Sequence, residues 1–143
     1  MTRHPDWERR LNAVIERHRD APGEWGVSDC FMLSVEAHEA VTGVKLLPNL
    51  RRYRSEKAGY RLFAKHGFTA VGEALASVLE PCGRLSAMRG DLGTIERDGI
   101  ESCGVVTAMG LAVKTLYGHG NTITSARLEY HPVTSITRAF RVG

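Results

Sequence analysis

The hydrophobic pattern changes its period near the middle of the chain, and this change restricts the fold more than any other feature. Apolar residues recur every three or four positions in the first half, as in helices, whereas the second half has short runs rich in valine, isoleucine and threonine. Helices followed by strands predict an α+β fold in which N-terminal helices pack on a C-terminal antiparallel β-sheet.

Capping and turn residues place the ends of the predicted helices. Asp6 is a suitable cap for the first helix, and Pro22-Gly23 favour its end near Asp20. Ser28 or Asp29 can cap the second, which Gly43 should stop. The predicted helices span residues 7–20, 30–42, 55–66 and 69–79.

The second half predicts strands separated by short turns. The turns contain Arg97-Asp98-Gly99, Gly110 and Gly118-His119-Gly120, so an antiparallel meander is expected, with the second helix packed on it. The predicted strands span residues 91–95, 102–109, 112–117, 122–128 and 137–142.

Composition indicates one globular domain over residues 1–143. Hydrophobic residues make up 43% of the chain and charged residues 24%, which suits a single core. No apolar run approaches the length of a membrane span, and the N-terminus lacks the apolar region of a secretory signal. Synthesis and assembly in the cytoplasm are therefore expected.

The net charge of +3 permits only weak attraction to acidic surfaces. Arg51-Arg52-Tyr53-Arg54 is a dense basic cluster that could contact phosphate, but a solvated loop is the favoured interpretation. A small nucleic-acid-binding domain is therefore a minor alternative, because the sequence shows no contiguous basic face.

Three cysteines, Cys30, Cys82 and Cys103, form an odd and widely spaced set. Such a set is neither a disulfide framework nor a paired metal-binding motif, so free thiols are expected and no metal or cofactor is predicted. Cys82, between Pro81 and Gly83, is most simply a loop residue.

Cys30 is the leading candidate for chemistry because it should lie in the first turn of a helix. Unpaired amide groups and the helix dipole favour a thiolate at this position. A cysteine nucleophile also needs a neighbouring base, usually histidine. The alternative is a purely structural role, in which Cys30 is a buried cysteine that packs between the helix and the sheet.

Several short motifs occur in an order that resembles the NlpC-like, papain-fold superfamily of cell-wall cysteine peptidases, in particular the compact members encoded in phage and prophage tail modules. These motifs are Trp25-Gly26, Asp29-Cys30, Thr42-Gly43, the Tyr53 region, Gly67-Phe68, Arg89-Gly90-Asp91-Leu92, Gly104-Val105-Val106 and Arg138-Ala139-Phe140-Arg141-Val142. The resemblance implies a papain-like core, Cys30 as nucleophile, and a histidine base just before the strand at Gly104.

The position that corresponds to this histidine holds Ser102 or Cys103, and neither is a good base near neutral pH. His38 would lie roughly 12 Å from Cys30 along the helix axis. His119 and His131 are the remaining weak candidates, with His119 preferred.

For three further residues, the sequence permits two roles each. Trp25 could line a substrate groove or pack in the core, and Asp29 could contact substrate or cap the helix. Cys103 could approach Cys30 closely enough for a disulfide or, with a histidine, a metal.

The expected function is therefore a tail-tip or tail-assembly protein on an NlpC-like fold, with peptidase activity lost or marginal. Its expected partners are other phage tail proteins and its final location is the virion tail. An active peptidoglycan endopeptidase that uses Cys30 is the alternative from a different class.

Overall fold

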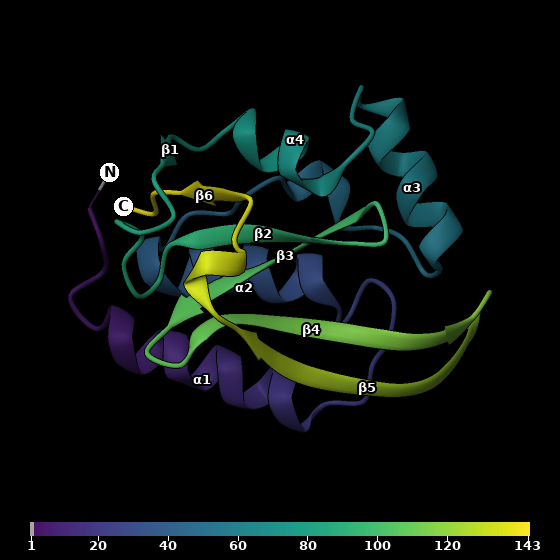
Figure 1. Cartoon of the computed structure of the whole chain (residues 1–143), viewed down its shortest axis with the longest axis horizontal. Helices are drawn as coiled ribbons and strands as arrows, with labels where there is room; N and C mark the ends of the chain where they lie inside the picture. The colour runs from purple at the N-terminus through teal and green to yellow at the C-terminus, as the bar shows by residue number, and fades with distance from the viewer. Residues whose placement is uncertain (1) are drawn as a thin grey trace.

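The computed structural model describes residues 2–143, and it confirms an α+β fold with four N-terminal helices packed on a six-stranded antiparallel open sheet (Figure 1). Helix α2 lies behind the strands in this view, and the yellow turn η2 lies in front of them. The helices are α1 (Trp7–Asp20), α2 (Cys30–Thr42), η1 (Pro48–Leu50), α3 (Glu56–Lys65), α4 (Val71–Ala76) and η2 (Val133–Ser135). The strands are β1 (Pro81–Cys82), β2 (Leu92–Arg97), β3 (Ile100–Thr107), β4 (Gly110–His119), β5 (Thr122–His131) and β6 (Arg138–Phe140).

The first two helices begin and end where the sequence predicts. Asp29 caps α2 and Gly43 ends it in the left-handed conformation that favours glycine. Asp6 precedes α1, but its side chain accepts no bond from the helix backbone and instead pairs with Arg9. The predicted cap at Asp6 is therefore wrong, because the arginine one turn later takes its carboxylate.

Helix α4 covers only residues 71–76, so the prediction of a helix over 69–79 is too long. The Ser77 hydroxyl donates to the carbonyl of Ala74 at 2.6 Å, a local bond that competes with helix propagation. Val78, which the prediction placed inside this helix, lies beyond its end and is 52% exposed.

The strand order is β1-β6-β2-β3-β4-β5. Strands β2 to β5 form the predicted meander, but β6 returns to pair with β2, with Gly93 opposite Ala139. This return buries Ile136 and Phe140, which explains why the last strand does not extend the meander. Strand β1 was not predicted; its two residues, including Cys82, form the edge beside β6, where a proline is tolerated.

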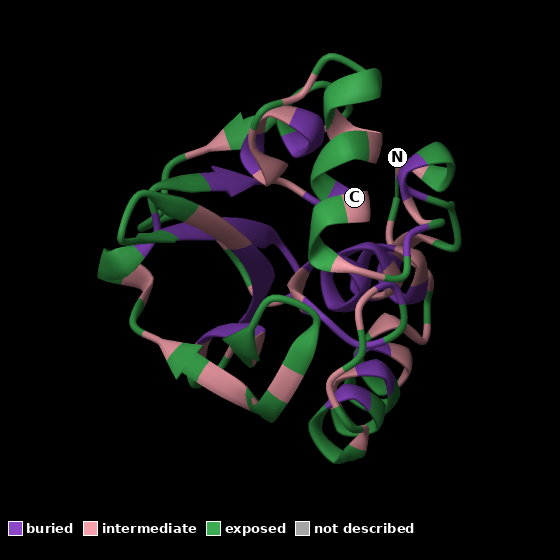
Figure 2. Ribbon diagram, turned by 90° about the vertical axis from the view of Figure 1, so that its right-hand side faces the viewer, coloured by how far each residue is buried: buried purple, intermediate pink, exposed green. Residues whose placement is uncertain are grey.

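Apolar side chains cover both faces of the sheet. One face, with Leu92, Val105 and Ala112, packs against α1 and α2. The other face includes Val106, Leu111 and Ile136. Buried segments accordingly gather in the middle of the molecule (Figure 2). Within residues 2–143, no helix is both long and apolar enough to cross a membrane.

A buried carboxylate joins both ends of the chain to the turn before β2. Asp91 is fully buried and forms ion pairs with Arg3 at 3.1 Å and Arg141 at 2.9 Å. It also accepts backbone bonds from Met88 and Val142. These four donors compensate the loss of hydration that burial imposes on the charge.

Lys114 of β4 connects the sheet to the end of α1. Its buried ammonium group donates to the carbonyls of His18 and Ala21 at 2.6 and 2.7 Å. Burial lowers the pKa of Lys114. Carbonyl groups at a helix C-terminus lack intrahelical partners, so this side chain satisfies groups that the fold would otherwise bury unpaired.

Candidate functional site

Cys30 is the first residue of α2, as the sequence predicts, and Asp29 caps the helix in front of it. The Asp29 carboxylate accepts a bond from the amide of Met32 at 2.8 Å. This bond fixes the first turn of α2. It therefore also fixes the position of the cysteine at the positive end of the helix dipole.

The second carboxylate oxygen of Asp29 faces the protein interior. It accepts bonds from the Gly26 amide at 2.9 Å and from the Tyr53 hydroxyl at 2.7 Å. Burial raises the pKa of Asp29 against the effect of these donors, and burial together with the Asp29 charge raises the pKa of Tyr53. Asp29 therefore organises the loop before α2, and only 2% of its surface is exposed to a substrate.

Tyr53 belongs to the family resemblance, but the sequence did not predict its contact with Asp29. It is buried against the loop that precedes α2, so the prediction of a solvated loop over residues 51–54 is wrong at this position. Arg51 also turns inward and donates to the carbonyl of Leu46. The sequence signals were an aromatic residue among arginines and the place of the Tyr53 region in the resemblance, and neither specifies burial against Asp29.

The Trp25-Gly26 turn requires its glycine. Gly26 has a φ of +79°, and a Cβ atom there would lie 1.9 Å from the carbonyl oxygen of Tyr53. Trp25 is partly buried and packs against the main core, and its buried indole nitrogen has no hydrogen-bond partner within residues 2–143. The structure thus places Trp25 at the boundary of the core.

Cys103 of β3 lies against Cys30, although the two residues are 73 positions apart in the sequence. Its Sγ donates to the Cys30 carbonyl oxygen at 3.5 Å, so the strand thiol lies against the backbone of the first turn of α2. Side chains alternate between the faces of a strand, so Ser102 lies on the opposite face from Cys103. Cys103, rather than Ser102, is therefore the residue that faces Cys30.

The two thiols differ in acidity. The hydrogen bond from Cys103 lowers the pKa of Cys30, whereas full burial raises the pKa of Cys103 well above its ordinary value. Cys103 is thus the thiol that keeps its proton to higher pH, and Cys30 is the first of the two to ionise as the pH rises. Both thiols are free, and Cys30 is the more exposed of the two.

No histidine within residues 2–143 forms a hydrogen bond with Cys30. His18 bonds to the Ser28 hydroxyl and to Glu36, and His38 bonds to the carbonyl of Val44. His131 lies 3.4 Å from Glu129 at the end of β5. Each of these rings has a structural partner away from the thiol pair.

His119 lies at the far end of β4, where it pairs with Thr122 beside the hairpin turn. Val105 of β3 pairs with Ala112 of the antiparallel strand β4. Measured from this pair, Cys103 lies two residues along the sheet and His119 lies seven residues along it in the same direction. At about 3.3 Å per residue, His119 is roughly 16 Å beyond Cys103. This placement does not bring the imidazole into hydrogen-bond reach of Cys30.

Nearly the whole chain matches a known protein family. Residues 2–142 match the family described as "Domain of unknown function (DUF6950)". The chain belongs to this DUF6950 family. No curated protein and no solved structure matches it.

The family description assigns no chemistry, so the arrangement around Cys30 has to be interpreted from its own geometry. Within the described part of this DUF6950 domain, no group of three or more histidine, cysteine or acidic side chains is placed to hold a metal ion. The chemical feature of the site is therefore a pair of neighbouring cysteines, one at a helix N-terminus and one on the adjacent strand, with the strand thiol donating to the carbonyl of the helix cysteine.

Proposed function

We propose that the chain is a phage tail-tip or tail-assembly interaction protein on an NlpC-like fold, in which a second thiol has replaced the peptidase base. The observation that supports this proposal is the hydrogen bond from the Cys103 thiol to the Cys30 carbonyl, with Cys103 at the strand position where the resemblance places histidine. In this interpretation, the fold is kept for its contacts with other tail proteins.

The arrangement of the elements supports the likeness to a papain-like core. Cys30 begins α2, α2 packs against β3, and the Gly90-Asp91-Leu92 motif leads into β2 beside it. These are the positions that the resemblance gives to the nucleophile helix and to the first two core strands.

The acidities of the two thiols support a loss of peptidase chemistry. A general base must accept the proton of the nucleophile, and the acid must later donate it to the leaving amine. Cys103 can donate a hydrogen bond to the Cys30 thiolate, but its raised pKa makes it a poor acid near neutral pH. Cys30 can thus be nucleophilic while the site lacks a group that shuttles protons.

The first experiment measures the alkylation of Cys30 by iodoacetamide as a function of pH, with mass spectrometry to assign the modified residue. We expect a midpoint below the ordinary thiol pKa of 9.0. The Cys103→Ala variant should have a higher midpoint because it removes the donor to the thiolate. Equal midpoints in the two proteins would contradict the proposed role of Cys103.

A second experiment separates the interaction protein from an active peptidase. Peptidoglycan fragments are incubated with the wild-type chain and with Cys30→Ala, and we expect no difference in products. Virions of the phage or prophage that encodes the chain should contain the Cys30→Ala protein at the wild-type level. Cleavage that disappears in Cys30→Ala would favour the endopeptidase, and absence of the wild-type chain from virions would refute the tail assignment.

A further inference from the structure

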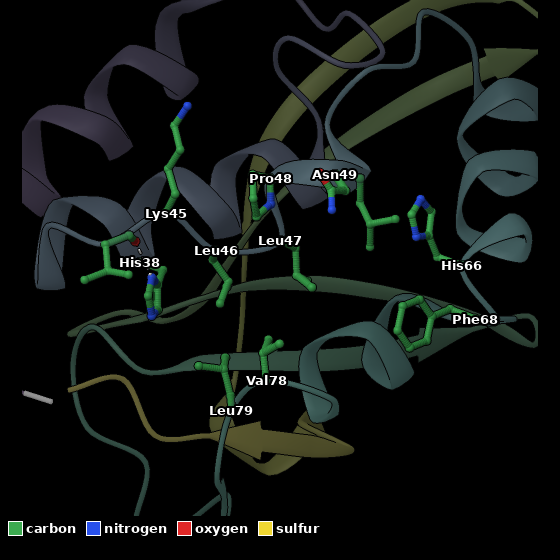
Figure 3. Close-up of a pocket in the computed structure, with 12 residues that line it drawn as sticks. His38, Lys45, Leu46, Leu47, Pro48, Asn49, His66, Phe68, Val78 and Leu79 are labelled. Atoms are coloured by element: carbon green, nitrogen blue, oxygen red, sulfur yellow. Dashed lines mark hydrogen bonds between the residues drawn. The ribbon is translucent and has the colours of Figure 1, made fainter.

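A pocket lies away from the thiols, between the loop after α2 and the segment that follows α4 (Figure 3). Its volume is about 370 Å³, within the range of small-ligand sites. Leu46 and Leu47 line it on one side and Val78 and Leu79 on the other, so the space between them suits a flat apolar group.

Exposed apolar residues extend the pocket onto the surface. Val44 is 47% exposed and Val78 is 52% exposed, and both contribute to the lining. The polar lining includes Lys45 and His66 but no acidic side chain. An apolar pocket with an apolar rim is typical of a surface that receives a side chain from another protein.

His38 supplies one specific polar group at the end of this pocket. The residue is 1% exposed, and its Nδ1 lies 3.0 Å from the carbonyl oxygen of Val44. A carbonyl can only accept, and the nearby Thr42 hydroxyl donates to the backbone carbonyl of His38. The proton of the neutral ring is therefore on Nδ1, and Nε2 carries an unshared electron pair.

This Nε2 acceptor is buried and has no hydrogen-bond partner within residues 2–143. Burial also lowers the pKa of His38, which keeps the ring neutral near pH 7 and preserves the acceptor. A buried acceptor without a donor destabilises the folded chain, and a ligand that supplies the donor removes this penalty when it binds. A ligand for this pocket should therefore combine an apolar ring with one O–H group.

The backbone of the same loop is strained. Leu47 has a φ of +47°, a conformation that is uncommon for residues other than glycine. Non-glycine residues held in this region are enriched at ligand-binding sites, where the strain fixes the position of the side chain. Leu47 thus adds an independent indication that this loop is shaped for binding.

We propose that this pocket binds the side chain of a tyrosine on a partner protein, with the ring between the leucine and valine side chains and the hydroxyl donating to His38 Nε2. Tyrosine fits because it joins a flat apolar ring to one donor, and because the exposed valines continue the apolar surface beyond the pocket. Nε2 is covered in the free chain, so a neighbouring side chain must move before the hydroxyl can reach it. This inference does not rest on the proposed function.

The test compares N-acetyl-tyrosinamide with N-acetyl-phenylalaninamide, which differ by the hydroxyl group, in calorimetric titrations of the full chain. We expect the tyrosine compound to bind roughly tenfold more tightly. In His38→Asn, the asparagine amide can still donate to the Val44 carbonyl, but the Nε2 acceptor is lost. The preference for tyrosine should then disappear, while the affinity for the phenylalanine compound should not change.

Equal affinities in the wild-type chain, a preference that persists in His38→Asn, or no binding of either compound would overturn the proposal. Binding of 4-ethylphenol without binding of N-acetyl-tyrosinamide would also overturn it, because the ligand would then be a free phenol. If His38→Asn does not fold, the exposed Val78→Asp variant replaces it and should weaken tyrosine binding roughly fivefold. Met109→Asp, at a 67% exposed position, is the matched control and should leave binding unchanged.

Discussion

Replacing Asp91 by alanine is expected to lower the free energy of unfolding by about 3–5 kcal/mol. Asp91 is fully buried, and its two oxygens pair with Arg3 and Arg141 and accept two backbone amides. The alanine leaves two arginine side chains and two buried amides without their shared acceptor. Equilibrium urea denaturation of both proteins measures the difference.

The control for Asp91 is an ion pair on the surface. Asp20 pairs with Arg19, but its side chain is 70% exposed, so Asp20→Ala should leave the free energy of unfolding close to that of the wild type. If Asp91→Ala does not fold, Arg141→Met provides a milder test, since it removes one of the four donors. A loss at Asp91 no larger than that at Asp20 would refute the role of the buried carboxylate.

Asp29→Ala should lower the free energy of unfolding by about 3 kcal/mol. The loss of a helix cap costs about 1 kcal/mol, and the orphaned Tyr53 hydroxyl and Gly26 amide add about 1 kcal/mol or more each. In the folded protein, the amides of Gly26 and Met32 and the hydroxyl of Tyr53 all donate to the Asp29 carboxylate. Denaturation experiments measure the loss, and faster alkylation of Cys103 would report a loosened thiol pair.

Ser55 offers a matched comparison for Asp29. Its hydroxyl caps α3 through one bond to Ala58 at 3.1 Å and has no further donor. Ser55→Ala should therefore cost only about 1 kcal/mol. Similar losses at Ser55 and Asp29 would show that Asp29 acts as a simple cap, without the additional role in ordering the loop beside Cys30.

The sequence predicted a helix or strand well where residues a few positions apart determine its start and end. The Asp29 cap, the Gly43 stop and the position of Cys30 in the first turn of α2 all depend on residues a few positions apart. The meander of β2 to β5 follows in the same way from short turns between runs of strand-forming residues. The helix over residues 69–79 failed because the Ser77 hydroxyl bonds back to the helix at its end.

The amino-acid order alone determined an α+β chain with a cysteine at a helix start and no histidine in the strand segment beside Gly104. The tertiary structure decided which strand β6 joins, that Tyr53 turns inward to Asp29, and that Cys103 faces Cys30. It also formed the pocket that leaves His38 Nε2 without a donor. Periodicity and capping act over one or two turns, whereas these contacts join distant segments whose meeting depends on burial of the whole core.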